Sequence, residues 1–487
     1  MNDIEKPSEP NFAADGEKPD ASERRDELLI TWDGPDDPEN PLNWSKPRKW
    51  GPTLITSAGG LVTLMSGAML APALQDISRD IHSGEEATNM ILSIFVLAFG
   101  CGPMVLAPLS EVCGRRVVWI VCSAWYVLWN TVCGFSNSQG LMLAGRILSG
   151  LGASADIPTL ADCWRAEERG YSFAIATFVP LLGPALGPIL GGVITNSIGW
   201  RWLFWVLSIF DGLLTVAAIF WFPECYEQVL LHWKATKLRK ERGLAYHTEW
   251  DLHTQPLATK LKRSISRPFW LLATQPILQL ISIFLAYNFG TLYLVLTEFA
   301  SVWTDRYHQS VSISGLHYIS LVTGSTIGSQ LGARATDKLW AYLKRRAHGV
   351  TAPEYRIPLL LPGLLFIPAG LLTYGWAAHS LSPWILVDIG AALFNLGLIM
   401  STQAYQQYVM EAFQEHGVVA SASAASQFLR NVFAFCFPLF APAMYRRLGL
   451  GWGNSLLAFV FWGVGVPAPV VLWRFGGRLR AKGRGLL

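Results

Sequence analysis

Twelve long apolar stretches recur along this chain, and they constrain its fold more than any other feature. Each is about 20 residues long, the length of an α-helix that crosses the hydrocarbon core of a bilayer. Only 15% of the 487 residues are charged, compared with about 25% in a typical soluble domain. The sequence therefore predicts an all-α membrane protein with twelve transmembrane helices. The predicted spans are 52–73, 87–107, 117–135, 141–161, 172–197, 202–222, 276–297, 311–333, 357–377, 384–409, 418–445 and 450–473.

A polar, basic segment at residues 223–269 divides the predicted spans into two sets of six. Two six-helix halves joined by a linker are typical of transporters that rock one bundle against the other. We therefore predict five parts, with an amphipathic helix on the membrane surface within the linker. They are an N-terminal tail (1–50), an N-terminal six-helix bundle (51–222), a linker (223–269), a C-terminal six-helix bundle (270–474) and a C-terminal tail (475–487).

The distribution of basic residues predicts the orientation in the membrane. If the N-terminus is inside, 31 of the 38 Lys and Arg residues lie in tails, linker and loops on the inner side. The positive-inside rule then places both termini and the linker in the cytosol. The start of the chain lacks the apolar core of a cleavable signal peptide. The seven Cys residues show no paired spacing, so we expect no disulfide framework, no metal site and no cofactor. The small net charge of +3 gives no indication of a nucleic-acid partner.

The loop after the second predicted span carries a charged motif, APLSEVCGRRVVW, at residues 107–119. Gly114 permits a tight turn, and Arg115 and Arg116 can pair with Glu111 or with the negative end of a nearby helix. The motif resembles the cytosolic loop signature of the major facilitator superfamily, although Val112 replaces a basic residue. In that family the loop locks conformations of the first bundle. The resemblance implies a conformational latch made by Glu111, Gly114, Arg115 and Arg116. The alternative is a simple basic loop that only fixes the topology.

A single arginine, Arg146, lies inside the fourth predicted span. A charged side chain there is costly and usually functional. The pattern R-x-x-S-G, which runs from Arg146 to Gly150, resembles a second motif of the superfamily, whose arginine is tied to proton transfer. The alternative is a guanidinium that extends to the outer membrane surface.

The fifth predicted span contains the stretch GPALGPILGG at residues 183–192. Gly183, Gly187 and Gly191 share one helical face, and small residues on such a face let another helix backbone come close. Pro188 is expected to bend the helix. The stretch resembles the antiporter signature of proton-coupled drug exporters, which most importers of the superfamily lack. The matching residues are Gly183, Gly187, Pro188, Gly191 and Gly192.

Three further segments resemble fungal multidrug and polyamine exporters of the twelve-span type. They are residues 31–50, PECYEQVLL from Pro223 and PEYRIPLLLPG from Pro353. The sugar-porter pattern expected after the sixth span is absent. The resemblance implies a plasma-membrane, monomeric antiporter that exchanges protons for drugs, toxins, secondary metabolites or polyamines. A proton-coupled importer or facilitator of a small nutrient is the alternative. A sensor that has lost transport is disfavoured by Arg146 and the complete signature. An enzyme is disfavoured because no phosphate loop, metal spacing or nucleophile elbow is found.

Ionisable side chains inside the spans are candidates for proton coupling, because they usually face a cavity and can bind a proton as water access alternates. Asp162 is expected in a cytosolic charge network, and Arg430 is expected to neutralise a buried partner. The coupling candidates are Arg146, Asp156, Asp211 and Glu298, with Asp388 near the outer end of its span. Aromatic faces and amides suited to a substrate cavity, or to a membrane-interface belt, are Tyr287, Asn288, Tyr293, Gln403, Tyr405 and Gln406.

Overall fold

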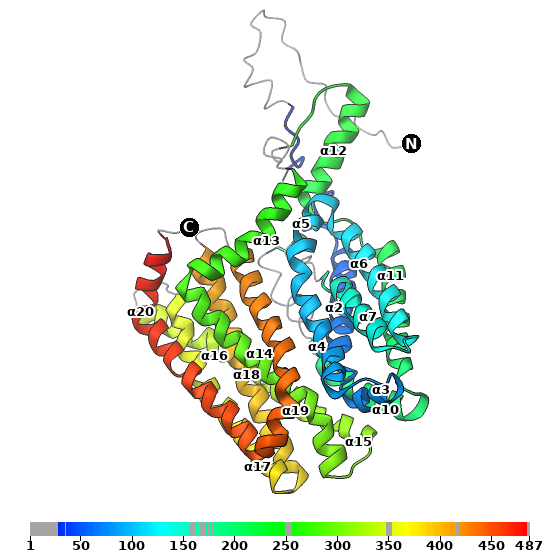
Figure 1. The fold of residues 1–487 in the computed structure, drawn as a ribbon. Coiled ribbons are helices and arrows are strands. Elements are labelled where there is room, and N and C mark those ends of the chain that lie inside the picture. Colours follow the sequence, from blue (N-terminus) through cyan, green and yellow to red (C-terminus); the bar gives the residue numbers. More distant parts are fainter. Residues whose placement is uncertain are drawn as a thin grey trace, which may run out of the picture.

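The computed structural model describes most of the chain, and two helical bundles stand side by side in it (Figure 1). The described residues are 28–34, 36–155, 162–165, 172, 176, 179–180, 182–248, 256–346, 353–414 and 419–484. Regular structure within these ranges is helical, apart from one β-bridge between Leu29 and His247. The all-α prediction is confirmed.

The N-terminal bundle contains the elements from α2 to α11. The second predicted span is divided into two helices that meet at an angle of 43°. Pro103 begins the second of them, because proline has no backbone N–H for the preceding turn. The elements are η1 (Pro41–Asn43), α2 (Lys46–Ala68), η2 (Ala71–Ala73), α3 (Leu74–Asp80), α4 (Glu85–Cys101), α5 (Pro103–Cys113), α6 (Arg115–Gly134), α7 (Gln139–Ala153), α10 (Gly183–Ile198) and α11 (Arg201–Trp221).

Two helices, α12 (Glu227–Arg242) and α13 (Leu257–Thr274), connect the bundles. They lie at one end of the molecule, opposite α10 and α15 (Figure 1). The C-terminal bundle contains α14 (Pro276–Ser301), the π-helical turn η4 (Val302–Arg306), α15 (Val311–Leu316), α16 (Tyr318–Arg346), η5 (Pro353–Leu360), α17 (Leu361–His379), α18 (Trp384–Gln414), α19 (Val419–Gly465) and α20 (Pro467–Arg484). Residues 475–484, predicted as part of a tail, continue α20.

Seven helices within the described ranges are long and apolar enough to cross a membrane, or eight if α4 and α5 count as one span. One of the seven, Ser421–Arg480, includes two predicted spans, because α19 combines two helices at Gly449, whose φ is +69°. The predicted fourth and fifth spans run into residues outside the described ranges. The apolar part of α10 that remains is Leu186–Ile198.

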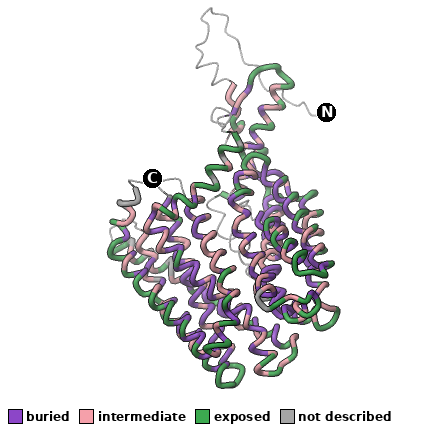
Figure 2. Tube along the Cα trace, viewed as in Figure 1, coloured by how far each residue is buried: buried purple, intermediate pink, exposed green. Residues whose placement is uncertain are grey.

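Buried side chains lie inside each bundle, whereas exposed residues follow the outer surfaces and the connecting helices (Figure 2). Many exposed side chains on α6 and α11 are large and apolar, including Val121, Leu128, Leu213 and Phe220. A continuous apolar exterior of this kind is suited to lipid rather than water.

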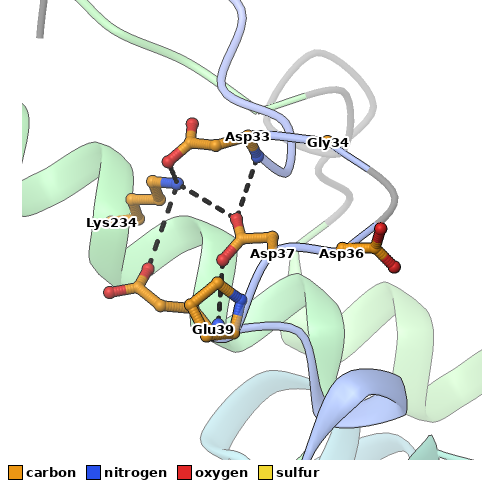
Figure 3. A pocket seen from close by; sticks show the side chains of 7 residues that line it. Asp33, Gly34, Asp36, Asp37, Glu39 and Lys234 are labelled. Carbon is orange, nitrogen blue, oxygen red and sulfur yellow. Dashed lines mark hydrogen bonds and ion pairs between the residues drawn. The ribbon is translucent and has the colours of Figure 1, made fainter.

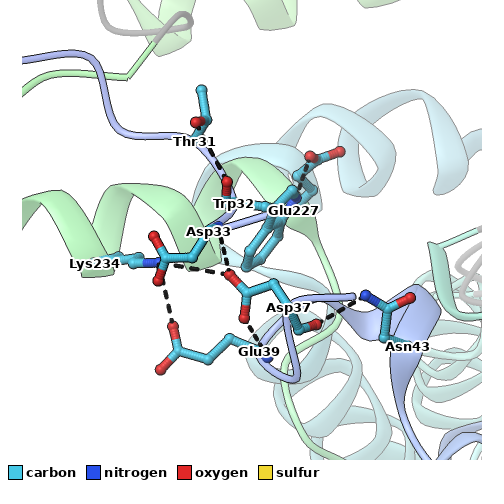
Figure 4. Close-up of polar contacts among 8 residues, drawn as sticks. All are labelled: Thr31, Trp32, Asp33, Asp37, Glu39, Asn43, Glu227 and Lys234. Atoms are coloured by element: carbon cyan, nitrogen blue, oxygen red, sulfur yellow. Dashed lines mark hydrogen bonds and ion pairs between the residues drawn. The ribbon is translucent and has the colours of Figure 1, made fainter. Parts of the chain in front are cut away.

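The segment before α2 is attached to α12. We call residues 28–34 and 36–43 the N-terminal clasp. The Lys234 ammonium lies 2.8 Å from a carboxylate oxygen of Asp33 and 3.6 Å from one of Asp37 (Figure 3). The Trp32 indole N–H donates to Glu227 Oε1 at 2.6 Å (Figure 4). Asp37 is buried and also accepts the backbone N–H groups of Asp33 and Glu39. The clasp therefore fixes α12 beside the N-terminal bundle.

The clasp should hold over a wide pH range. Burial opposes ionisation of Asp37, but the backbone N–H groups of Asp33 and Glu39 and the Lys234 ammonium outweigh it and lower the pKa of Asp37 below 3.8. A carboxyl group whose pKa is lowered by folding stabilises the folded form at any pH above its ordinary pKa. This contribution is lost as the pH falls through the lowered pKa. We therefore expect the clasp to loosen only in strong acid.

Replacing Lys234 with alanine should loosen the clasp at neutral pH. The ion pairs lie near the surface, where each contributes about 1 kcal/mol or less, so amide hydrogen exchange in the clasp should quicken about 5-fold. Hydrogen-exchange mass spectrometry of the full chain measures this. Lys237→Ala is the matched control, because Lys237 is exposed one turn further along α12. Equal exchange in the two variants would show that the ion pairs do not hold the clasp.

Candidate functional site

A cavity of about 1190 Å³ lies between the two bundles. Its wall comes mainly from α2, α4, α5, α6, α7, α13 and α19, and includes the aromatic side chains of Phe99, Trp119 and Tyr126. The charged side chains among its lining residues are Glu111, Asp211, Arg263, Arg267 and Arg430. Glu111 and Arg263 are exposed, so the cavity reaches solvent on the side of α5 and α13. The volume is sufficient for a drug-sized organic molecule.

Asp211, one of the predicted coupling acids, is a buried acid of the cavity wall. It is 4% exposed, and the Ser123 hydroxyl donates to its Oδ2 at 2.6 Å. Ser123 Oγ also lies 2.6 Å from Thr215 Oγ1. Asp211 and Ser123 both line the cavity. A carboxyl group in this position can exchange a proton with the cavity while Ser123 holds its orientation.

Arg146 is fully buried, which excludes the alternative of a guanidinium at the outer surface. Its nitrogens donate to the backbone carbonyls of Ile91 and Ser66 at 3.1 and 3.0 Å, and to Ser66 Oγ at 3.2 Å. The guanidinium carbon lies 4.2 Å from the centre of the Phe95 ring. Arg146 therefore joins α7 to α2 and α4, and no carboxylate pairs with it among the described residues.

Arg430 differs from its prediction. The structure shows no acidic partner for it within the described ranges. The guanidinium instead lies over the Phe289 ring, 3.9 Å from its centre, and lines the cavity. Its buried Nε has no hydrogen-bond partner. The expected neutralising acid is therefore not found among the described residues, where α19 directs this side chain toward the cavity.

The six side chains predicted for the substrate cavity do not line it in this conformation. The Tyr287 hydroxyl donates to the Leu457 carbonyl at 2.6 Å, and the Tyr405 ring packs against Phe284 at 4.5 Å between centres. These contacts place both rings in the core of the C-terminal bundle, which also excludes an interface belt for them. Of the remaining four, Asn288 is buried, and the Gln403 amide donates to Ser329 Oγ at 3.0 Å. Tyr293 and Gln406 are half-buried.

Two other predicted acids, Glu298 and Asp388, lie apart from the cavity wall. Glu298 is half-buried and accepts from the Ser301 hydroxyl at 3.3 Å. Asp388 pairs with His317 Nδ1 at 2.8 Å. Asp156 lies outside the described residues.

In the charged loop between α5 and α6, Arg115 binds Asp162 and Glu224 rather than the predicted Glu111. Arg115 Nε pairs with Asp162 at 3.0 Å, whereas the described contacts include no ion pair between Arg115 and Glu111. The Glu224 carboxylate accepts the backbone N–H groups of Arg115 and Arg116 at 2.9 and 3.1 Å. Glu111 is exposed at the mouth of the cavity. The pairing of Arg115 with Glu111 was therefore wrong, because tertiary packing brings in acids that are distant in the sequence.

The contact between the Glu224 carboxylate and the first N–H groups of α6 also requires a glycine at position 114. The φ of Gly114 is +95°, and a Cβ there would lie 2.3 Å from Glu224 Oε2. Any side chain would displace the carboxylate that binds the first N–H groups of α6. The loop thus connects α5, α6 and the segment after α11 through one buried charge cluster.

The glycines of α10, a helix at the end of the molecule opposite α13 (Figure 1), form a close-packed seam. A Cβ on Gly183, Gly187 or Gly191 would lie 2.8, 3.2 or 2.2 Å from atoms of α2 or of the turn after it. A Cβ on Gly192 would lie 2.7 Å from the Val311 carbonyl oxygen of α15, in the other bundle. Conversely, a Cβ on Gly315 would lie 2.8 Å from the Pro188 carbonyl oxygen. The seam joins α10 to its own bundle and closes this end between the bundles.

Comparison with known proteins agrees with this architecture. The family profile described as Major Facilitator Superfamily matches residues 56–438. The chain belongs to the major facilitator superfamily. Members of this superfamily are multi-pass membrane transporters rather than enzymes.

The most informative relatives of this superfamily member are fungal. It is 41% identical over 469 residues to "Efflux pump vrtL" of Penicillium aethiopicum, covering 94% of this chain and 92% of the relative. It is 41% identical over 421 residues to "Probable efflux pump mfs2" of Aspergillus flavus, covering 85% and 99%. These relatives confirm the resemblance to fungal efflux transporters of the superfamily. A solved D-xylose–proton symporter shares the fold, with a TM-score of 0.64, 17% identity and coverage of 88% and 97%.

One residue of this transporter's charge cluster was not identified from the sequence. Glu224 lies in the quoted stretch PECYEQVLL, but it was not named as a site residue. Its carboxylate accepts the N–H groups of Cys225 and Tyr226 as well as those of Arg115 and Arg116. An acid directly after a proline at the end of an apolar span is the signal that could have indicated it.

Breaking the Arg115–Asp162 pair should slow transport by this protein without preventing its insertion into the membrane. A hydrogen-bonded charge that loses its partner forfeits about 1.5–3 kcal/mol, so Arg115→Ala and Asp162→Asn should each lower the transport rate about 10-fold or more. Glu111→Gln should have a much smaller effect on the cluster, because Glu111 does not pair with Arg115. Transport normalised to membrane abundance measures this. If Glu111→Gln alone lowered the transport rate as much as Arg115→Ala, the latch would depend on Glu111, as the sequence predicted.

Proposed function

We propose that this chain is a proton-coupled antiporter that exports small organic molecules, such as drugs, toxins, secondary metabolites or polyamines, by alternating access. The observation that carries the proposal is the glycine seam of α10, which resembles an antiporter signature and packs against both bundles. Two close-packed arrangements of similar energy are what a rocking movement requires. The names of the fungal efflux relatives support export as the direction.

In this proposal the structure corresponds to an inward-facing state. The seam closes the outer end, while the cavity reaches solvent beside α5 and α13, the side that carries the basic linker. Asp211 is the coupling carboxyl group, which binds a proton from outside and releases it when the cavity faces the cytosol. Both termini and the linker lie in the cytosol, the protein acts as a monomer, and it resides in the plasma membrane.

The test is efflux from fungal cells that lack their own pumps and express the full chain with a fluorescent tag. Cells are loaded with a compound panel, and the loss of each compound is followed with and without a protonophore. We expect loss that the protonophore abolishes, and fluorescence at the plasma membrane. Proton-driven accumulation instead of loss would contradict export and favour the nutrient-importer alternative.

A further inference from the structure

We propose that the deep part of the cavity recognises an acidic group on its substrate, so that the exported class is amphipathic organic anions rather than polyamines or other cations. This inference rests on the proposed transport function and names the substrate class of the same cavity. It begins from Arg430, whose guanidinium forms part of the cavity wall.

Arg430 has the features of an arginine prepared to bind an anion. Its Nε is buried without a hydrogen-bond partner, and its guanidinium stacks on the ring face of Phe289. Leaving a buried donor without a hydrogen-bond partner costs free energy. Such a donor is therefore expected where a bound ligand supplies the missing acceptor. A guanidinium matches a carboxylate with two parallel hydrogen bonds, and the Phe289 ring holds it in place.

A second cation increases the positive potential nearby. The Tyr293 ring centre lies 5.9 Å from that of Phe289, on which Arg430 stacks. A Cβ on Gly67, next to the Arg146 partner Ser66, would lie 3.5 Å from the Tyr293 hydroxyl, so Tyr293 lies between the regions of the two arginines. Arg146 is bonded to carbonyl and hydroxyl oxygens, and no described carboxylate neutralises it. In a low-dielectric interior, charges of one sign raise the local concentration of ligands of the other sign.

The mouth of the cavity carries two more cations. Arg263 and Arg267 both line it and are four residues apart on α13, where like charges repel. Burial and the Arg263 cation lower the pKa of Arg267. An anion that passes between them relieves this repulsion, which favours entry of acids over amines.

The two acids of the wall are less suited to bind a cation. Asp211 already accepts the Ser123 hydroxyl at 2.6 Å, and Glu111 is exposed to solvent at the mouth. The rings of Phe99, Trp119 and Tyr126 supply an apolar, stacking surface for the rest of the molecule. The matching substrate is an aromatic molecule with one acidic group.

The experiment compares three probes of similar shape: the anion naphthaleneacetate, its neutral amide naphthaleneacetamide, and the cation naphthylethylamine. Equilibrium binding of each radiolabelled probe is measured by scintillation proximity on the purified full chain. The variants are Arg430→Gln, Arg430→Lys and, as matched control, Arg447→Gln, which removes an exposed arginine of α19 outside the cavity wall. Size-exclusion profiles establish that each variant is folded.

We expect the wild type to bind the anion more tightly than the amide or the cation. Arg430→Gln should weaken anion binding about 10- to 100-fold, as for loss of a charged hydrogen bond, and change amide binding less than about 3-fold. Arg430→Lys should retain part of the preference, and Arg447→Gln all of it. Tighter binding of the cation by the wild type, or an unchanged anion preference in Arg430→Gln, would overturn the inference.

The direction of transport is tested separately in cells that contain naphthaleneacetate. Uptake of the bound acid would contradict the proposed exporter while leaving the anion site intact. Export of the cation without binding of the acid would support the proposed exporter and contradict the anion site.

Discussion

Replacing Gly192 with alanine is expected to shift the protein out of the conformation described here and to lower export at least 5-fold. The added methyl group would lie 2.7 Å from the Val311 carbonyl oxygen of the opposite bundle. Overpacking typically costs about 1–3 kcal/mol, which changes the ratio of two conformations by roughly 5- to 150-fold. In the proposed mechanism the cost falls on the closed outer end alone, because α10 and α15 would separate as the bundles rock.

The reciprocal variant, Gly315→Ala, should act in the same direction, since its methyl group would meet the Pro188 carbonyl oxygen at 2.8 Å. The matched controls are Gly212→Ala and Gly463→Ala, at which an added Cβ meets no atom within 4 Å. The measurement is the rate at which a membrane-impermeant maleimide modifies a cysteine placed at the buried Ser314, alongside efflux. If Gly192→Ala left both rates at the control values, the contact of α10 with α15 would not be part of the gate.

The second large effect is expected at Asp211. An amide cannot bind and release a proton, so Asp211→Asn should reduce proton-driven efflux at least 100-fold while substrate binding is retained. Equilibrium exchange of substrate across the membrane needs no net proton movement and should continue. Ser123→Ala removes the 2.6 Å hydrogen bond to Asp211 and should cost less, because the carboxyl group itself remains.

The measurement is efflux and exchange in proteoliposomes with an imposed pH gradient. Continued proton-driven efflux by Asp211→Asn would assign coupling to another acid, and Glu298 would then be examined first. Loss of exchange together with efflux would indicate instead that Asp211 supports the structure of the cavity.

The sequence predicted the features that depend on local pattern. Apolar length predicted the helices, and the spacing of Gly183, Gly187 and Gly191 predicted one close-packing face, which the structure places against α2. Arg146 was recognisable because a charge inside a span is rare. These signals are local, since each is contained within a single helix.

The cavity wall and the partners of Arg115 could not be predicted in the same way. A helix that is apolar on all sides does not reveal which face its neighbours cover, so Tyr287 and Tyr405 could be assigned equally well to the core or to the cavity. The acids near Arg115 come from positions 47 and 109 residues further along the chain. Only the assembled bundle brings Asp162 and Glu224 to it.

The glycines of the seam and the residues of the cavity wall are separate sets, although α2 contributes to both regions. None of the glycines at positions 183, 187, 191 and 192 lines the cavity, and their contacts are made largely with backbone atoms. The cavity wall, by contrast, is made partly of small side chains such as Ala107, Ser421 and Ala424, which face open space. Substitutions there change the shape available to a ligand while leaving the glycine contacts of the seam intact. A protein built in this way can acquire new cargo through a few changes while its mechanical parts stay the same.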